Sequence, residues 1–138
     1  MKSYIHPSDA AAAAFFSQEY QGEIVMLNLL KFKQQADYSE SPELAPQQPI
    51  SGEEAYELYM KHTAPFLQES GGELLFYGQS NHFLIGPETE SWDVVMLVKQ
   101  SSIQNFMAFA SNKAYLKGLG HRSAALADSR LLPITLTK

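Results

Sequence analysis

The sequence predicts a single α+β domain built on an antiparallel sheet. Three observations support this: the chain has 138 residues, it has no cysteine, and nearly continuous apolar segments alternate with segments of helical periodicity. A chain of this length buries a core without disulfides or metals. After one leading helix, the predicted order is strand, helix, strand, strand, helix, strand, which is the split βαβ pattern of a ferredoxin-like sheet.

The composition excludes several classes of protein. Hydrophobic residues make up 45% and charged residues 18%, as in a globular domain. Without cysteine there is no disulfide scaffold, cysteine-ligated zinc, iron–sulfur cluster or cysteine nucleophile. Ten Lys plus Arg and a net charge of −5 argue against nucleic acid or an anionic membrane as partner. The apolar run at 10–16 is too short for a membrane span and poor as a signal peptide, so we expect a cytoplasmic protein.

The first elements are a helix over residues 8–20 and a strand over 23–32. Ser8 or Asp9 caps the helix, five alanines favour it, and Gly22 ends it, so residues 1–22 form an N-terminal helical extension. The strand is apolar on both faces, which indicates that both faces are covered. Its polar exceptions, Asn28 and Lys31, point to opposite faces.

Residues 33–51 are predicted to be a flexible insertion, because three prolines and four glutamines leave little apolar surface to bury. A capping box at Ser51 and Glu54 begins the next helix, which runs to about Ser70 and ends at Gly71-Gly72. Pro65 lies inside this helix and predicts a kink or a break near Thr63.

A hairpin and the second helix follow. We expect a long strand over 73–85 with a bulge or bend at Gly78, a turn at 86–88, and a second strand over 92–99. Ser102 caps a helix that breaks at 111–112 before a short turn around Tyr115. A loop flanked by Gly118 and Gly120 then leads to His121-Arg122, one helical turn over 123–128 and a last strand over 131–137, which Pro133 places at an edge.

The pattern also predicts assembly. Both helices of the split βαβ unit cover one face of the sheet, yet the strands over 23–32 and 92–99 are apolar on both faces. Only the N-terminal helix or a second copy of the chain is left to cover the other face. A second copy is the simpler answer, and two sheets packed face to face form a two-fold homodimer with a barrel-like centre.

Several short motifs, weak singly, occur in an order and spacing that resemble the DUF1330 family over residues 23–133. They are Met26-Leu27-Asn28-Leu29-Leu30-Lys31-Phe32, Tyr56-x-x-Tyr59, Gly71-Gly72 with Gly78, Gly86-Pro87-Glu88, Trp92-Asp93, Tyr115, and His121-Arg122-x-Ala124-Ala125-Leu126-x-Asp128-Ser129-Arg130-Leu131. The resemblance implies a ferredoxin-like subunit of the dimeric α/β barrel superfamily and a side-by-side dimer. The N-terminal helix and the 33–51 insertion depart from the family pattern.

The resemblance implies no single reaction. The wider superfamily includes haem-degrading and cofactor-free monooxygenases, a lactone isomerase, peroxidases and ligand-binding regulators, so fold analogy spreads over several classes. Three functions stay open: a cofactor-independent monooxygenase or isomerase acting on a small apolar or aromatic acid or lactone, a non-catalytic ligand-binding or sensory dimer, and a purely structural dimer.

Three residues are candidates for catalysis. Asn28 is an amide within an apolar strand, and it either makes a structural hydrogen bond or points into a cavity to polarise a ligand carbonyl. His121 titrates near neutral pH and is a candidate acid or base. Arg122 is suited to clamp a carboxylate; the structural alternative is an ion pair with Asp93 or Asp128.

Five further residues are candidates for ligand binding. Tyr59 and His62 share a helix face and could pass a proton, or they merely reach solvent. Trp92 and Asp93 begin a strand, and Lys31 ends one. We expect a small apolar pocket between the sheet and its helices, edged by Asn28, Tyr59, His62, Trp92, His121 and Arg122. The four histidines show no metal-ligand spacing, and no phosphate-binding or cofactor motif occurs, so neither metal nor cofactor is predicted.

Overall fold

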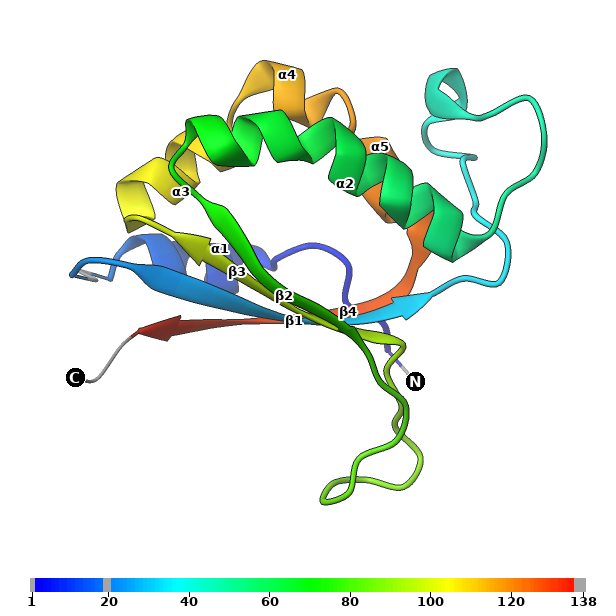
Figure 1. Ribbon diagram of the computed structural model, residues 1–138, viewed down its shortest axis with the longest axis horizontal. Helices are drawn as coiled ribbons and strands as arrows, with labels where there is room; N and C mark the ends of the chain where they lie inside the picture. Colours follow the sequence, from blue (N-terminus) through cyan, green and yellow to red (C-terminus); the bar gives the residue numbers. More distant parts are fainter. Residues whose placement is uncertain (1, 19–20, 136–138) are drawn as a thin grey trace.

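The computed structural model describes residues 2–18 and 21–135 (Figure 1). A four-stranded antiparallel sheet in the order β2-β3-β1-β4 lies under a layer of helices, which is the predicted α+β ferredoxin-like fold. The elements are α1 (Asp9–Phe16), β1 (Ile24–Phe32), the 3-10 helix η1 (Pro42–Leu44), α2 (Gly52–Glu69), β2 (Glu73–Gln79), β3 (Val94–Gln100), α3 (Ile103–Ala110), α4 (Lys113–Leu116), α5 (Leu119–Ala125) and β4 (Leu126–Thr135).

Helix α2 begins as predicted and ends near the predicted place. The Ser51 hydroxyl accepts from the Glu54 N–H, and the Glu54 carboxylate accepts from the Ser51 N–H. At the other end, Gly71 takes a φ of +84°, which a residue with a side chain rarely adopts. The predicted break near Thr63 is wrong, because the helix continues through Pro65 to Glu69. Packing along the whole length of a helix outweighs the one hydrogen bond that a proline removes.

Helix α1 is shorter than predicted and packs on the helix side of the sheet. Of the two predicted caps, Ser8 is the one that begins the helix, which ends at Phe16 with Ser17 as its C-cap. Residues 17 and 18 were predicted to be helical and are not, and Tyr20 lies outside the described residues. The ring of Phe15 meets the ring of Phe106 on α3 edge-on, with centroids 5.7 Å apart. The N-terminal helix therefore does not cover the other face of the sheet.

The hairpin differs from the prediction in length and bulge position. Strand β2 ends at Gln79 rather than at residue 85, and its register shifts between Leu74 and Phe76 rather than at Gly78. Residues 80–91 instead form a projecting hairpin loop, here called the arm (Figure 1). Gly78 has a packing role, since a Cβ there would lie 2.5 Å from the Phe76 ring.

The C-terminal part reorders three predicted elements. Gly120, His121 and Arg122 lie on helix α5 rather than after a loop, and this helix ends at Ala125, so the helical turn predicted over 123–128 is wrong. Strand β4 begins at Leu126, five residues earlier than predicted, because residues 126–135 pair with β1 along its length. Strand β4 is an edge strand, as Pro133 predicted. Thr137 lies outside the described residues.

The segment 33–51 packs against the domain. Its main chain pairs with the region that joins α5 to β4, through Lys33 N to Ala125 O at 2.8 Å and Asp37 N to Ala124 O at 3.0 Å. Ala36, Tyr38 and Ile50 pack against the core. These contacts differ from the predicted flexible insertion, since a few well-placed apolar side chains are enough to dock a polar segment.

The two faces of the sheet have different surroundings. On the covered face, Ile24, Met26, Asn28 and Leu30 of β1 are buried beneath the helices, as predicted. The other face, here called the open face, carries a row of apolar side chains across all four strands. The row consists of Phe76, Leu97, Leu27 and Leu132, and its two outermost members, on the edge strands, are 55% and 60% exposed.

Candidate functional site

The predicted site residues fall into two groups and one isolated residue. Tyr59, His62, His121 and Arg122 lie on α2 and α5 in the helix layer. Lys31, Trp92 and Asp93 lie at the end of β1 and the base of the arm. Asn28 stands apart, in the middle of β1 on the covered face.

Three tyrosines form a cluster in the helix layer, here called the tyrosine cluster: Tyr56 and Tyr59 on α2 and Tyr115 on α4. The Tyr59 and Tyr115 hydroxyls are 2.7 Å apart, and the rings of Tyr56 and Tyr59 are 5.3 Å apart. Burial raises the pKa of Tyr56 and of Tyr115, and the neighbouring Tyr59 adds to both rises. Tyr56 and Tyr115 therefore keep their protons at any physiological pH and offer hydroxyl donors.

Arg122 faces this cluster without a carboxylate beside it. Its Nη1 donates to the Ile5 carbonyl at 2.6 Å, and its charge opposes part of the rise in pKa of Tyr56 and Tyr115. Among the described residues, no carboxylate lies within ion-pair distance of it. The alternative ion pair with Asp93 or Asp128 is therefore wrong: Asp128 pairs with Arg130 at 2.6 Å, and Asp93 accepts from the Phe32 N–H.

The two histidines of the helix layer have separate partners. His62 Nε2 lies 2.9 Å from the Ala114 carbonyl, which only accepts, so this nitrogen carries a proton. His62 also fills the space beside Gly118, where an added Cβ would collide with the His62 ring. Since His62 bonds to the chain of α4 and Tyr59 bonds to Tyr115, the two do not form the direct proton relay that their spacing suggested.

His121 bonds to the segment 33–51. Its Nδ1 lies 2.7 Å from the Tyr38 hydroxyl, and the two rings meet edge-on. Burial lowers the pKa of His121, and the charge of His62 lowers it further. His121 is therefore neutral at pH 7, which is the form that a proton acceptor needs.

Asn28 makes the structural hydrogen bond that the sequence allowed. Its Nδ2 donates to the carbonyl of Met26, two residues away on the same strand, at 3.1 Å. Its side chain is 6% exposed. The amide is thus held under the helices, and it shares no hydrogen bond with His121 or Arg122.

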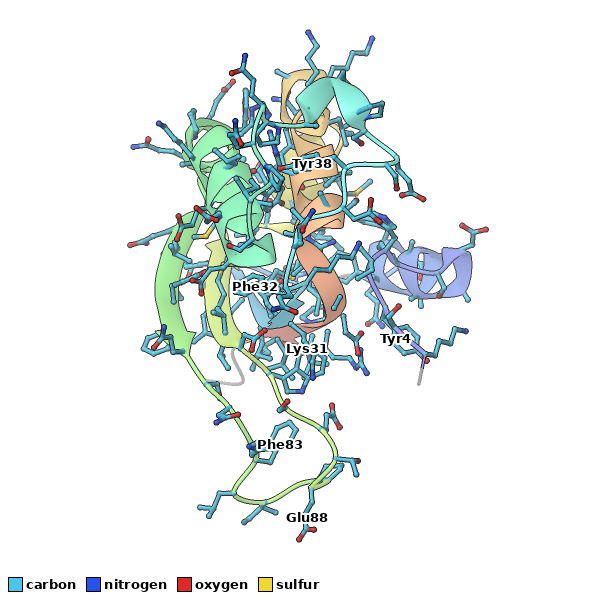
Figure 2. The ribbon with its side chains drawn as sticks, turned by 90° about the vertical axis from the view of Figure 1, so that its right-hand side faces the viewer. Tyr4, Lys31, Phe32, Tyr38, Phe83 and Glu88 are labelled. Carbon is cyan, nitrogen blue, oxygen red and sulfur yellow. The ribbon has the colours of Figure 1, made fainter. Side chains whose placement is uncertain are left out.

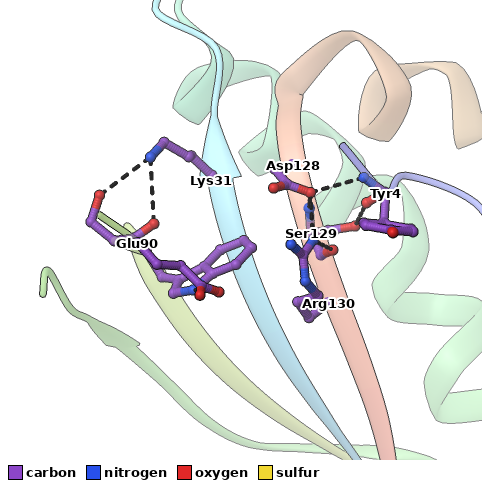
Figure 3. A network of polar contacts seen from close by, with 8 residues as sticks. Tyr4, Lys31, Glu90, Asp128, Ser129 and Arg130 are labelled. Atoms are coloured by element: carbon purple, nitrogen blue, oxygen red, sulfur yellow. Dashed lines mark hydrogen bonds and ion pairs between the residues drawn. The ribbon is translucent and has the colours of Figure 1, made fainter. Parts of the chain in front are cut away.

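Lys31 and Trp92 of the second group belong to a set of polar contacts at the base of the arm (Figure 3). Lys31 Nζ donates to the Ser91 hydroxyl at 3.2 Å, and the Trp92 indole N–H donates to Glu90 at 3.1 Å. The Arg130 guanidinium lies over the rings of Tyr4 and Trp92, at 4.7 and 5.0 Å from their centroids. Lys31 and Trp92 therefore fix the arm to the sheet.

An open groove of about 430 Å³ lies near the ends of β1 and β2 and the start of α2. Asp93 is the only predicted site residue among its lining residues, which are Phe32, Lys33, Ser51, Glu53, Gln79, Ser80 and Asp93. The groove is mainly polar and lies beside the base of the arm, so it differs from the apolar pocket that was expected between the sheet and the helices. Within the described residues, no three His, Asp or Glu side chains gather as a metal site would need.

Sequence reasoning missed Tyr38, Tyr56 and Tyr115 as site residues. A signal was present for two of them. Tyr56 and Tyr59 are three residues apart in a helix and so share a face. Tyr38 is the one aromatic residue in the polar segment 33–51. Nothing in the sequence indicated that Tyr115 would meet them.

Comparison with known proteins identifies a relative that is described as a protein of unknown function. No family model matches the chain, so the resemblance to DUF1330 stays a prediction, and no curated protein matches it. The solved structure of the RPA0582 protein is 31% identical, covers 100% of this chain and 98% of its own, and has a TM-score of 0.88. A second structure of that protein, described as of unknown function from Rhodopseudomonas palustris, has a TM-score of 0.87 and the same identity over 99% of each chain.

Two more distant structures show the same fold. A dabb family protein with a ferredoxin-like fold from Mesorhizobium loti is 8% identical, with a TM-score of 0.53 over 86% of this chain and 100% of its own. A dimeric ferredoxin-like protein of unknown function from Jannaschia sp. CCS1 is 10% identical, with a TM-score of 0.54 over 83% of this chain and 100% of its own. No helix among the described residues is both long and apolar enough to cross a membrane.

Proposed function

We propose that this chain, which belongs to the same family as the RPA0582 protein of Rhodopseudomonas palustris, binds a small carboxylic acid through Arg122. The observation that carries the proposal is a half-buried guanidinium that has no carboxylate partner among the described residues. A buried cation is normally balanced by an anion. A ligand carboxylate would supply that balance.

The tyrosine cluster supports the same ligand. In the Tyr59–Tyr115 pair one hydroxyl donates to the other, which leaves one proton of the pair free to donate to a ligand oxygen. The rings of Tyr56, Tyr59 and Tyr115, with Phe109 at 4.5 Å from Tyr115, offer an apolar wall. A carboxylate on a small apolar or aromatic body fits both features.

The test is a titration with phenylacetate, and with its uncharged analogue phenylacetamide, followed by calorimetry. A hydrogen bond to a charged group contributes about 1.5–3 kcal/mol, so Arg122→Gln should weaken phenylacetate binding at least about tenfold. Arg130→Gln is the matched control, because the only other arginine already has Asp128 as its partner. Undetectable binding to the natural protein, or equal binding to Arg122→Gln, would reject the proposal.

A second candidate function is proton transfer on the bound acid, with His121 as base. His121 adjoins Arg122 on α5, and burial keeps its imidazole neutral. With Nδ1–H donating to Tyr38, Nε2 would hold the lone pair that takes a proton from the carbon beside the carboxylate. Exchange of deuterium from D₂O into phenylacetate, lost in His121→Gln, would support catalysis. Binding without exchange would leave a ligand-binding protein.

We also propose that the protein is a homodimer that joins through the open face. The apolar row of Phe76, Leu97, Leu27 and Leu132 has no cover among the described residues, and α1 packs on the other side. Similar folds are described as dimeric in other proteins. Two cations near the row have carboxylate partners in the same chain, Lys99 with Glu23 and Glu73, and Arg130 with Asp128, which reduces charge repulsion between two copies.

The molar mass in solution tests the dimer. Light scattering at micromolar concentration should give twice the mass of one chain. Leu132→Glu puts a charge in the apolar row and should give one chain, whereas Leu58→Glu, an exposed leucine on α2, should leave the mass unchanged. A natural protein with the mass of one chain would reject the homodimer.

A further inference from the structure

The arm is a formed hairpin and not a loose loop. At its base, Ser80 N–H donates to the Asp93 carbonyl and Trp92 N–H donates to the Asn81 carbonyl, both at 2.9 Å. Beyond these bonds, His82 and Ser91 form an antiparallel bridge. The Lys31 ammonium holds Ser91 to the end of β1. The tip is therefore carried at a fixed place in the molecule.

The tip of the arm is apolar and lies in solvent. Leu84 is 100% exposed and Ile85 is 92% exposed, while the neighbouring Phe83 ring folds back over Gly86 (Figure 2). Single exposed apolar side chains are common on protein surfaces, but two adjacent and almost fully exposed aliphatic side chains on a projecting arm are typical of a contact site. No other described residue covers them to any large extent.

The arm points toward the side on which a second copy would lie. Both ribbon views show it turning away from the helix layer and passing beyond the open face (Figures 1 and 2). Six residues from 80 to 85 span up to about 20 Å when extended, whereas two sheets pack about 10 Å apart. An arm of that reach extends past a sheet packed on the open face and must lie beside it.

We infer that each arm clasps the second copy of the homodimer, with Leu84 and Ile85 packed against the other subunit. The inference rests on the proposed homodimer. A two-fold axis places two such arms in one dimer, each reaching over the partner, so both tips leave water in one association step. The net charge of −5 disfavours the other apolar target of such a tip, an anionic membrane surface.

The dissociation constant of the dimer tests the clasp. The double variant Leu84→Ser with Ile85→Ser should weaken the dimer at least about 100-fold in sedimentation experiments, because four buried aliphatic side chains are lost per dimer. Glu88→Ser, on the same arm and exposed, is the matched control and should leave the constant unchanged. A dimer whose dissociation constant does not change in the double variant would overturn the clasp alone.

The absence of cysteine allows a direct measure of burial at the tip. We expect the thiol introduced by Leu84→Cys to react with a soluble disulfide reagent at least about tenfold more slowly in the dimer than in the Leu132→Glu background. Gln48→Cys, exposed on the segment 33–51, should react equally fast in both. Equal rates for position 84 in both backgrounds would overturn the clasp.

The outcomes separate the two proposals. A natural protein that is monomeric rejects the homodimer and removes the clasp with it. A natural protein that is dimeric, with a reactive thiol at position 84, rejects the clasp and leaves the homodimer. Protection of that thiol by phosphatidylglycerol vesicles, but not by dimerisation, would also reject the clasp and assign the tip to a membrane.

Discussion

The two faces of one sheet differ in what covers them, although the strands supply apolar residues to both. On the covered face, Ile24 and Leu30 have no exposed surface, and the buried amide of Asn28 has a partner. On the open face, Phe76 and Leu132 lie more than half in solvent. The alternation along β1 is therefore one of burial and not of hydrophobicity.

Strand β1 is apolar along nearly its whole length, and its two faces differ in what covers them. Such a strand indicates two covered faces, and the subunit covers only one. The same contrast appears between the two arginines. Arg130, at the open face, has a carboxylate and two rings as partners, while Arg122, in the helix layer, has a carbonyl but no carboxylate within the described residues. We therefore place a second subunit on the uncovered open face and a ligand carboxylate beside Arg122.

The first prediction concerns the covered face and has the largest expected effect on stability. Leu30→Ala should lower the free energy of unfolding by about 2–5 kcal/mol, because Leu30 has no exposed surface and its truncation leaves a cavity in the core. Leu132→Ala, the same change on the open face, should cost less than about 1 kcal/mol in the dilute subunit. Urea unfolding at low protein concentration measures both. Equal costs would show that the two faces do not differ as described.

A smaller effect concerns the polar end of the open face. Burial raises the pKa of Asp128, but hydrogen bonds from the Tyr4 N–H, Arg130 and the Ser129 N–H outweigh it and leave the pKa below its usual value. Asp128→Asn should therefore lower the stability by about 1–2 kcal/mol at pH 7. Urea unfolding measures this cost, with Glu88→Gln as the exposed control that should change nothing.

The stability that the Asp128 carboxylate contributes should depend on pH. The folded pKa of Asp128 is lowered, so its contribution is complete above the usual pKa near 3.8 and is lost as the pH falls through the folded value. The difference between the natural protein and Asp128→Asn should shrink in that acid range. A difference that stays constant down to the acid transition would show that the carboxylate charge plays no part.

The smallest expected effect lies in the helix layer. Because the pKa of His121 is lowered in the folded state, its contribution to stability is complete above the usual value of 6.5 and declines as the pH falls from 6.5 through the folded pKa. His121→Gln should flatten this decline by less than about 1 kcal/mol, since solvent screens a partly exposed group. Thermal unfolding at pH 7.5 and pH 5.5 measures it, and an unchanged slope would contradict it.

Local chemistry predicted the elements that it governs. The Ser8, Ser51 and Ser102 caps are where the sequence placed them, because capping depends on a few neighbouring residues. The predictions were wrong where distant pairing decides. Residues 126–130 have helical neighbours in the sequence, yet β1 pairs with them and makes them strand. Residues 83–85 look like strand but have no strand partner among the described residues.

In the candidate site too, residue types could be predicted from the sequence, whereas contacts between distant segments could not. Residue type was enough to select Arg122 and His121 as candidates. The alternative ion pair of Arg122 with Asp128 was wrong, because Asp128 pairs with Arg130. Tyr38 and Tyr115 reach His121 and Tyr59 from segments 83 and 56 residues away in the chain. No spacing rule connects residues so far apart.

The fold class, the helix caps, the edge position of Pro133 and the excess of apolar surface on the strands could all be predicted from the sequence. These depend on residue type, period and local turn chemistry, which short segments carry. The tertiary structure was needed to show that α1 lies on the helix side and that Leu84 and Ile85 are exposed on an arm. It was also needed to show that Arg122 lies beside Tyr56 and Tyr115 with no carboxylate partner in the described part of the chain. Such properties depend on which distant segments meet, and the packing of the whole chain selects those contacts.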